Sequence, residues 1–184
     1  DGVCFVELDA IQAARDVAGA IALALGLTPA ADQAPEEIVR AHLAPRDLLL
    51  VLDNCQHILE AAPHFGDWLS AAPKLRLLCT SRVALDLYGE YEWDLAPLAL
   101  PDLAHLPTLD ELAQVPSVQL FTARARAVRA AFRLDAENAL AVSALCAALD
   151  GLPLALEIAA ARVRDLSAQE LLRQIMAARQ PSQL

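Results

Sequence analysis

Five consecutive aliphatic residues, Leu48 to Leu52, place the strongest constraint on how this chain can fold, because Asp53 and Asn54 follow them at once. An apolar run of this length predicts a strand that is buried on both faces, as in a parallel α/β sheet. The Asp53 carboxylate then emerges at the carboxyl end of the strand, where open α/β sheets bind their ligands. A carboxylate at that place can position a hydrated Mg²⁺ beside nucleotide phosphates. The alternative is a buried strand whose final aspartate caps the next helix.

The first half of the chain alternates between strand and helix patterns. β-Branched and aromatic residues between Gly2 and Asp9 predict an initial strand, and apolar residues at helical spacing follow it. A further short strand is expected near 90–95, where Trp93 is interpreted as a core residue. The order is that of an α/β protein with crossover helices. The expected strands are 3–8, 48–52, 75–80 and 90–95, and the expected helices are 15–26, 35–43 and 58–71.

Composition changes after residue 96. Four prolines between 97 and 116 punctuate a loop-rich linker, which is expected to hold one short helix near 109–113. The sequence therefore predicts an α/β part at 1–96, a linker at 97–116 and an all-α part at 117–184. The helices expected in the last part are 117–130, 136–149, 154–163 and 168–178.

Charge and composition exclude several classes of protein. With 57% hydrophobic and 21% charged residues, the chain is expected to form a core and not to be disordered. The net charge of −10 and the pI near 4.7 oppose direct binding to DNA or RNA, whose backbones are anionic. A mononucleotide stays compatible, because its site needs only local donors and a metal ion. No apolar stretch reaches the roughly 18 residues of a membrane span and no signal peptide is visible, so a cytoplasmic protein is expected.

The cysteines and histidines form no recognisable ligand pattern. The cysteines contain no CxxC pair, and no Cys/His spacing fits a zinc site. The cysteines are predicted to be small buried hydrophobic residues in a reducing compartment. The residues concerned are Cys4, Cys55, Cys79 and Cys146, with the scattered histidines His42, His57, His64 and His105.

Three motifs occur in order along the chain: LLLVLDNCQH at 48–57, CTSR at 79–82 and GLPLALE at 151–157. Together they resemble the STAND class of P-loop ATPases, close to the NB-ARC domains. The resemblance covers nearly the whole chain, and it is greatest to the ATPase modules of large bacterial LuxR-type and SARP-type transcriptional regulators. It implies a parallel P-loop-type sheet followed by a helical lid subdomain, with ATP or ADP and Mg²⁺ as ligands.

The resemblance assigns roles to five residues. Asp53 would be the Walker B aspartate that holds Mg²⁺ through water, and Asn54 beside it could orient water but could not act as a strong base. Arg82 is similar to a sensor arginine whose guanidinium bonds the γ-phosphate. Gly151 and Pro153 resemble the helix break that places a proline against adenine. The alternatives are a surface arginine at a strand end and an ordinary corner between two helices.

One motif that such an ATPase needs is absent. Gly-x-x-x-x-Gly-Lys-Ser/Thr, whose backbone N–H groups cradle the phosphates, does not occur. Gln56 also stands where close relatives carry glutamate. The chain, which lacks an initiator methionine, therefore resembles a segment that begins just after the P-loop helix, inactive as an ATPase alone and without tightly bound nucleotide. Its expected partners are the missing P-loop segment and the other domains of the parent protein.

The resemblance also places the missing P-loop strand between the strands at 48–52 and 75–80. Its absence would leave two apolar sheet edges, which favour pairing with another chain. We therefore expect the isolated segment to be poorly stable or to self-associate. A monodisperse monomer would contradict this expectation.

Two functions are compatible with these features. The first is an ATP/ADP conformational switch, in which the nucleotide reorients the helical part and so controls an effector domain that binds DNA. The alternative is a degenerate, non-catalytic protein-interaction module with the same fold. An unrelated metabolic enzyme is disfavoured, because the sequence contains no nucleophile elbow, dinucleotide glycine fingerprint or metal-ligand cluster.

Overall fold

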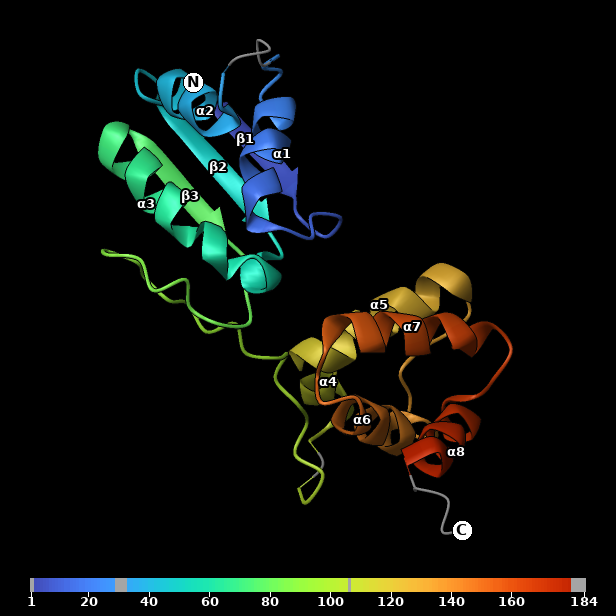
Figure 1. Cartoon of the computed structure of the whole chain (residues 1–184). Helices are drawn as coiled ribbons and strands as arrows, with labels where there is room; N and C mark the ends of the chain where they lie inside the picture. The colour runs from blue at the N-terminus through green and yellow to red at the C-terminus, as the bar shows by residue number, and fades with distance from the viewer. Residues whose placement is uncertain (1, 29–32, 106, 180–184) are drawn as a thin grey trace, which may run out of the picture. The chain divides into compact units, whose positions relative to one another are not determined.

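The computed structural model describes residues 2–28, 33–105 and 107–179 (Figure 1). The chain divides into two units, at residues 1–93 and 94–184, and each is described by itself. The first unit combines a parallel sheet with helices, and the second contains only helices. The mixed α/β class predicted from the sequence is confirmed.

The sheet of the first unit has three parallel strands in the order β1-β2-β3. Each connection between neighbouring strands runs through helices, as in other parallel sheets. The strands are β1 (Gly2–Glu7), β2 (Leu48–Asp53) and β3 (Leu75–Cys79), and the helices are α1 (Val17–Ala24), α2 (Pro35–Leu43) and α3 (Ala62–Ala71).

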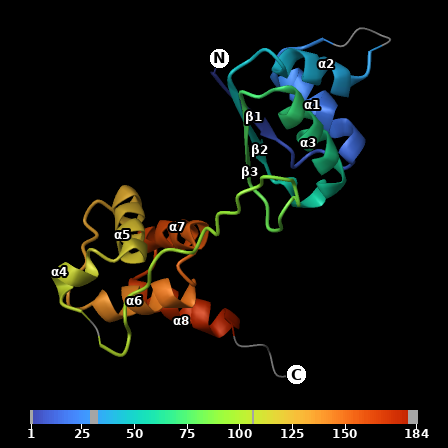
Figure 2. The ribbon, with the colours of Figure 1, turned by 90° about the vertical axis from the view of Figure 1, so that its left-hand side faces the viewer.

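All three helices cover the same face of the sheet (Figure 2). Because successive strand side chains alternate between faces, every second residue points to these helices. Leu50 is fully buried there, in a core with Phe65. The other face carries Val3, Phe5 and Leu78, whose exposed fractions are 68%, 55% and 55%. No described helix of the first unit covers this apolar face, which we call the open face.

The prediction that β2 is buried on both faces is wrong. Leu48, Leu50 and Leu52 are buried, but Leu49 and Val51 between them are only partly buried. A central parallel strand needs helices on both sides to be fully buried, and the described part of the first unit supplies them on one side only.

The predicted gap between 48–52 and 75–80 is also wrong, because β2 and β3 pair directly with each other. Leu50 is the register partner of Leu77, and Leu52 is that of Cys79. The single helix α3 joins the two strands, and such a short crossover brings consecutive strands side by side. The outer edges of this sheet therefore belong to β1 and β3, and β2 lies at its centre.

The strand predicted at 90–95 does not form. Residues 90–100 have no regular secondary structure, and Trp93, which was expected in the core, is 89% exposed. A strand exists only where a neighbour completes its hydrogen-bond ladder. The described residues offer no such partner for this segment, although its two aromatic residues suit a strand.

The second unit packs four main helices around an apolar core. Helix α5 lies against α7, and α6 lies against α8. Phe121, Leu145 and Leu156 are fully buried between them. The short helix expected in the linker is present, and the four longer helices are where the apolar spacing predicts them. They are α4 (Leu109–Leu112), α5 (Pro116–Val128), α6 (Ala139–Ala148), α7 (Pro153–Ala161) and α8 (Ala168–Arg179).

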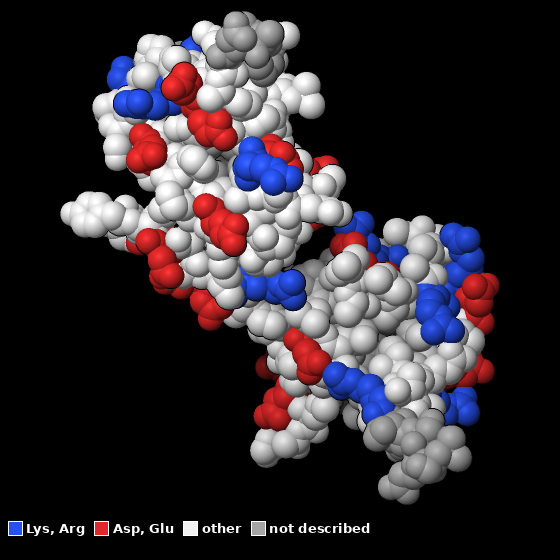
Figure 3. Space-filling model, viewed as in Figure 1, with Lys and Arg blue, Asp and Glu red and all other residues white. Residues whose placement is uncertain are grey.

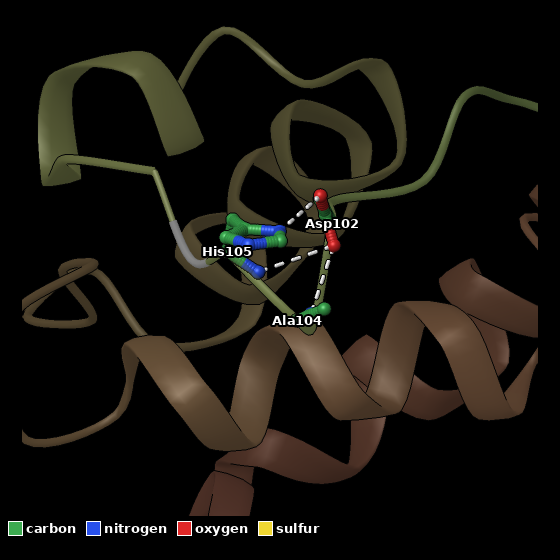
Figure 4. A network of polar contacts seen from close by, with 3 residues as sticks. All are labelled: Asp102, Ala104 and His105. Carbon is green, nitrogen blue, oxygen red and sulfur yellow. Dashed lines mark hydrogen bonds and ion pairs between the residues drawn. The ribbon is translucent and has the colours of Figure 1, made fainter.

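The proline-rich segment before α4 is ordered by local hydrogen bonds. Asp102 Oδ1 accepts the backbone N–H of Ala104 at 2.8 Å and that of His105 at 3.2 Å, and the imidazole lies 3.4 Å from Oδ2 (Figure 4). The two backbone bonds hold the pKa of Asp102 below its usual value. Further back, the Leu98 N–H donates to the Gly151 carbonyl at 3.0 Å, so this segment belongs to the helical unit.

Most of the negative charge belongs to the first unit, whose sequence contains 14 acidic and 6 basic residues against 10 and 8 in the second. Acidic and basic side chains are interspersed over the visible face of each unit (Figure 3). No helix among the described residues is both long and apolar enough to cross a bilayer.

Candidate functional site

The carboxyl ends of the three strands meet at one border of the sheet. The Leu8 N–H donates to the Asp53 carbonyl at 3.1 Å, and the Thr80 N–H donates to the Leu52 carbonyl at 3.0 Å. Parallel strands place all their carboxyl ends on the same side, so polar residues that follow each strand come together there. We call this group, which consists of Asp9, Asp53, Asn54, His57 and Thr80, the strand-end cluster.

The Asp53 carboxylate is held in place by Thr80. The Thr80 hydroxyl donates to Asp53 Oδ1 at 2.6 Å and accepts the Asn54 backbone N–H at 2.9 Å. A short hydrogen bond to an ionised acceptor is stronger than one between neutral groups, so it fixes the orientation of the carboxylate. The second oxygen, Oδ2, accepts no hydrogen bond from the residues that the structure describes, and it is left for a ligand.

Asn54 turns the chain at the end of β2. It has φ 69° and ψ 56°, in the left-handed region that asparagine tolerates better than most residues. Its side-chain amide donates to Asp9 Oδ1 and so links the ends of β1 and β2. The amide N–H groups of the predicted catalytic residue are therefore partly used within the cluster, which favours a positioning role over direct contact with a reacting water.

His57 is hydrogen-bonded to the loop that follows β1. Its Nε2 lies 2.8 Å from the Ile11 carbonyl oxygen and 3.0 Å from the Leu8 carbonyl oxygen. Because both neighbours are acceptors, Nε2 carries the proton. In the sequence, His57 was noted only as one of the scattered histidines and within the motif at 48–57, and Thr80 only as part of the motif at 79–82. The available signal was their position, a few residues past the end of a buried strand.

Cys55 and Cys79 lie beside the cluster as free thiols. Their side chains form a hydrogen bond, which raises the pKa of Cys55, with burial adding to the effect. The same bond lowers the pKa of Cys79, although burial and the nearby Glu90 act against it. The cysteines were predicted as separate buried residues, so their contact is new information from the structure.

Arg82 lies in the bend that follows β3, in the same unit as Asp53. Its side chain is exposed and makes no hydrogen bond or ion pair with the described residues. It is thus available to an anionic ligand. The sensor role that the resemblance assigns to Arg82 stays a prediction.

Gly151 and Pro153 belong to the other unit, at the corner between α6 and α7. Gly151 has φ +67°, and a Cβ atom there would lie 2.3 Å from the Leu98 carbonyl oxygen. Pro153 is the first residue of α7, where its missing N–H costs nothing. Local backbone geometry therefore explains the glycine and the proline without any ligand. Their contact with a nucleotide stays a prediction.

The residues present suit part of a Mg·nucleotide site. Asp53 offers one oxygen at the place where a hydrated cation would be expected. The first N–H groups after β2 cannot cradle phosphates, because the Asn54 N–H binds the Thr80 hydroxyl and the Cys55 N–H binds the Thr80 carbonyl. Within the described ranges, no group of three or more His, Cys, Asp or Glu residues could hold a metal ion by itself.

Two hollows elsewhere in the molecule are unrelated to these residues. One of about 430 Å³ lies between α2 and α3 and is lined by Glu36, His64 and Trp68 among others. The second, of about 200 Å³, lies in the helical unit beside Arg129 and Arg133. Neither is lined by the strand-end cluster, Arg82, Gly151 or Pro153.

The chain is similar to proteins of mycobacteria. It is 38% identical over 172 residues, or 93% of its length, to proteins of Mycobacterium tuberculosis and Mycobacterium bovis named "Putative HTH-type transcriptional regulator". It is 41% identical over 126 residues to uncharacterized proteins of the same two species. The chain spans 18% of the length of the former and 29% of the latter. No family model matches the chain, and no solved structure matches it.

Proposed function

We propose that this chain is a segment of a signal-transducing STAND ATPase, which acts as an ATP/ADP conformational switch inside a transcriptional regulator. The α/β unit would hold Mg²⁺ and the phosphates, and the helical unit would act as the lid. Bound Mg²⁺ would supply charge neutralisation at the phosphates. The chain is not competent alone, because the phosphate cradle is missing.

The observation that carries the proposal is the strand-end cluster. Asp53 ends the central strand of a parallel sheet, and Thr80 on the next strand fixes its carboxylate through a 2.6 Å hydrogen bond. This leaves one oriented carboxylate oxygen at the border where open α/β sheets bind nucleotides. Arg82 follows two residues after Thr80 and has no partner among the described residues.

The shape of the first unit supports the need for a further segment. The open face carries exposed Val3, Phe5 and Leu78, and the outer edge of β3 is unpaired within the described chain. A strand at that edge, followed by a helix on the open face, would bury these side chains. The aromatic segment at 90–95 could then pair as a strand on the far side of the added one. A P-loop strand and helix would have this form.

The relatives support the wider setting. Proteins named as HTH-type transcriptional regulators contain a region 38% identical to this chain, which covers less than a fifth of their length. A module of this size inside a longer regulator can couple a ligand to an effector through a change in domain arrangement. The partners proposed are thus the P-loop segment and the other domains of the same protein.

The alternative is a non-catalytic interaction module with the same fold. Asn54 bound to Asp9, Gln56 in place of glutamate and the lack of a phosphate cradle in this chain favour it. In that case the open face would bind a partner protein and no nucleotide would be involved. The sequence that precedes this segment in the parent protein separates the two functions, since only an ATPase needs Gly-Lys-Ser/Thr there.

The test uses the intact parent protein and titration calorimetry with Mg·ATP and Mg·ADP. Asp53→Asn is expected to weaken Mg²⁺-dependent nucleotide binding by about tenfold or more, the usual loss when a metal site is disturbed. Arg82→Ala is expected to remove the preference between ATP and ADP while ADP still binds. Asp47→Asn, at the opposite end of β2, is the matched control and should behave as the unmodified protein.

The two functions give different results in this experiment. A parent protein that binds neither nucleotide would reject the switch and leave the interaction module. Nucleotide binding that Asp53→Asn leaves unchanged would reject the role of Asp53 in holding Mg²⁺. The chain of 184 residues alone should bind neither nucleotide tightly.

A further inference from the structure

Cys55 and Cys79 come together because of how β2 ends. Cys79 is the last residue of β3 and the register partner of Leu52. After Leu52 the chain turns through the left-handed Asn54, and the Cys55 N–H then donates to the Thr80 carbonyl at 2.9 Å. This turn carries Cys55 over the end of the neighbouring strand. Both side chains lie on the helix-covered side of the sheet, where Cys55 belongs to the buried core and Cys79 packs against it.

The two thiols differ in their access to solvent. Cys55 is fully buried, and its Sγ also lies 3.6 Å from the Leu52 carbonyl oxygen. Cys79 is partly exposed, at the border of the sheet. An attacking thiol must be reached by its oxidant, whereas a resolving thiol needs only to reach the first sulfur. The arrangement therefore gives Cys79 the first role and Cys55 the second.

We propose that Cys55 and Cys79 are a redox-sensitive pair, which a small-molecule disulfide such as oxidised glutathione converts into an intramolecular disulfide. The Cys79 thiolate attacks one glutathione sulfur, so a mixed disulfide forms and the first glutathione leaves as a thiolate. The Cys55 thiolate then attacks the Cys79 sulfur and releases the second glutathione. Two protein thiols are oxidised, one glutathione disulfide is reduced, and the two thiol protons pass to the two departing thiolates.

The other two cysteines do not have this arrangement. Cys4 lies on β1, and the whole of β2 separates it from β3. Cys146 is fully buried in α6 of the helical unit. Only the pair at the ends of β2 and β3 combines neighbouring backbone positions on one side of the sheet with a route to solvent.

Oxidation would act on the strand-end cluster, because Cys55 directly follows Asn54 and Cys79 directly precedes Thr80. A disulfide holds its sulfur atoms about 2.05 Å apart, closer than any hydrogen bond between thiols. The backbone at both positions must adjust, and with it two hydrogen bonds of the Thr80 hydroxyl, which accepts the Asn54 N–H and donates to the Asp53 carboxylate. The inference depends on the thiols alone, so it stands whether or not the chain binds a nucleotide.

The experiment oxidises the full chain with glutathione disulfide, blocks remaining thiols, and maps tryptic peptides without reduction. Cleavage at Lys74 and Arg76 separates Cys55 from Cys79, so only a disulfide keeps the two peptides together. Four cysteines have three pairings, and an unfolded chain should show this linkage in about one third of fully oxidised molecules. The native chain is expected to show it about three times as often as the same chain oxidised in urea.

Variants identify the order of the two steps. Cys55→Ala should stop at the mixed disulfide and accumulate one glutathione on Cys79, whereas Cys79→Ala should leave Cys55 as a thiol. Cys4→Ala is the matched control and should form the linkage normally. A native chain in which the linkage is absent, or no more frequent than in urea, would overturn the proposal. So would a Cys79→Ala chain that takes up glutathione on Cys55 as readily as the unmodified chain does on Cys79.

Discussion

Replacing Gly151 with alanine is expected to destabilise the helical unit by about 2 kcal/mol. The residue has φ +67°, and a left-handed alanine costs roughly 1–2 kcal/mol. The added Cβ would lie 2.3 Å from the Leu98 carbonyl oxygen, a backbone atom that cannot rotate away. Moving that segment weakens the hydrogen bond from the Leu98 N–H to the Gly151 carbonyl, and the loss of this bond costs about 1 kcal/mol of stability. Alanine also lowers the conformational entropy of the unfolded chain relative to glycine, which offsets roughly 0.5–1 kcal/mol of this loss.

Thermal unfolding of the two units, followed by hydrogen exchange of α6 and α7, measures this loss. For a unit of this size, 2 kcal/mol corresponds to a fall in Tm of about 10 °C. Gly19→Ala is the matched control: it lies inside α1 with no atom within 4 Å of the added Cβ, and alanine should stabilise that helix by up to about 1 kcal/mol. If Gly151→Ala changed the stability by less than about 0.5 kcal/mol, the size of an ordinary surface substitution, the reasoning would fail.

Two further predictions concern pH and the open face. Hydrogen bonds from the backbone and hydroxyl of Ser167 lower the pKa of Glu170, so their stabilisation of α8 is complete above the pKa of the unfolded chain and disappears as the pH falls through the folded value. In urea unfolding, the difference in free energy of unfolding between the unmodified chain and Glu170→Gln should therefore shrink to zero between pH 7 and pH 3. A difference that stays constant with pH would contradict this. Phe5→Ser combined with Leu78→Ser should reduce self-association in analytical ultracentrifugation with little loss of stability, whereas Leu50→Ala in the core should cost about 2–5 kcal/mol. Unchanged association would show that the open face is not the contact.

The sequence allowed the local elements to be predicted where the pattern was strong. The aliphatic run from Leu48 gave the central strand, and it placed Asp53 at the end of that strand. The helical spacing after residue 116 gave α5 to α8, because each of these helices buries one apolar side against its neighbours. These features depend on residues that are close in the sequence.

The predictions that were wrong concern features that depend on residues distant in the sequence. The number of covered faces of β2 depends on which helices pack on it, and a run of aliphatic residues does not reveal that. The composition of 90–95 suits a strand, but a strand also requires a partner edge. Thr80 and His57 were missed as parts of the candidate site, since their hydrogen bonds join residues 27 to 49 positions apart.

Because the described helices pack on only one face of β2, its five aliphatic positions should differ in how well they tolerate substitution. Leu50 and Leu52 are required for this segment to fold, whereas Leu49 and Val51 matter only to whatever surface meets them in a longer protein. A library selected for folding of this chain alone would keep aliphatic residues at alternate positions and accept polar ones between them. A library selected for the activity of a complete regulator would keep all five. If aliphatic residues are required only at every second position, one face of the strand is buried. If they are required at every position, both faces are buried.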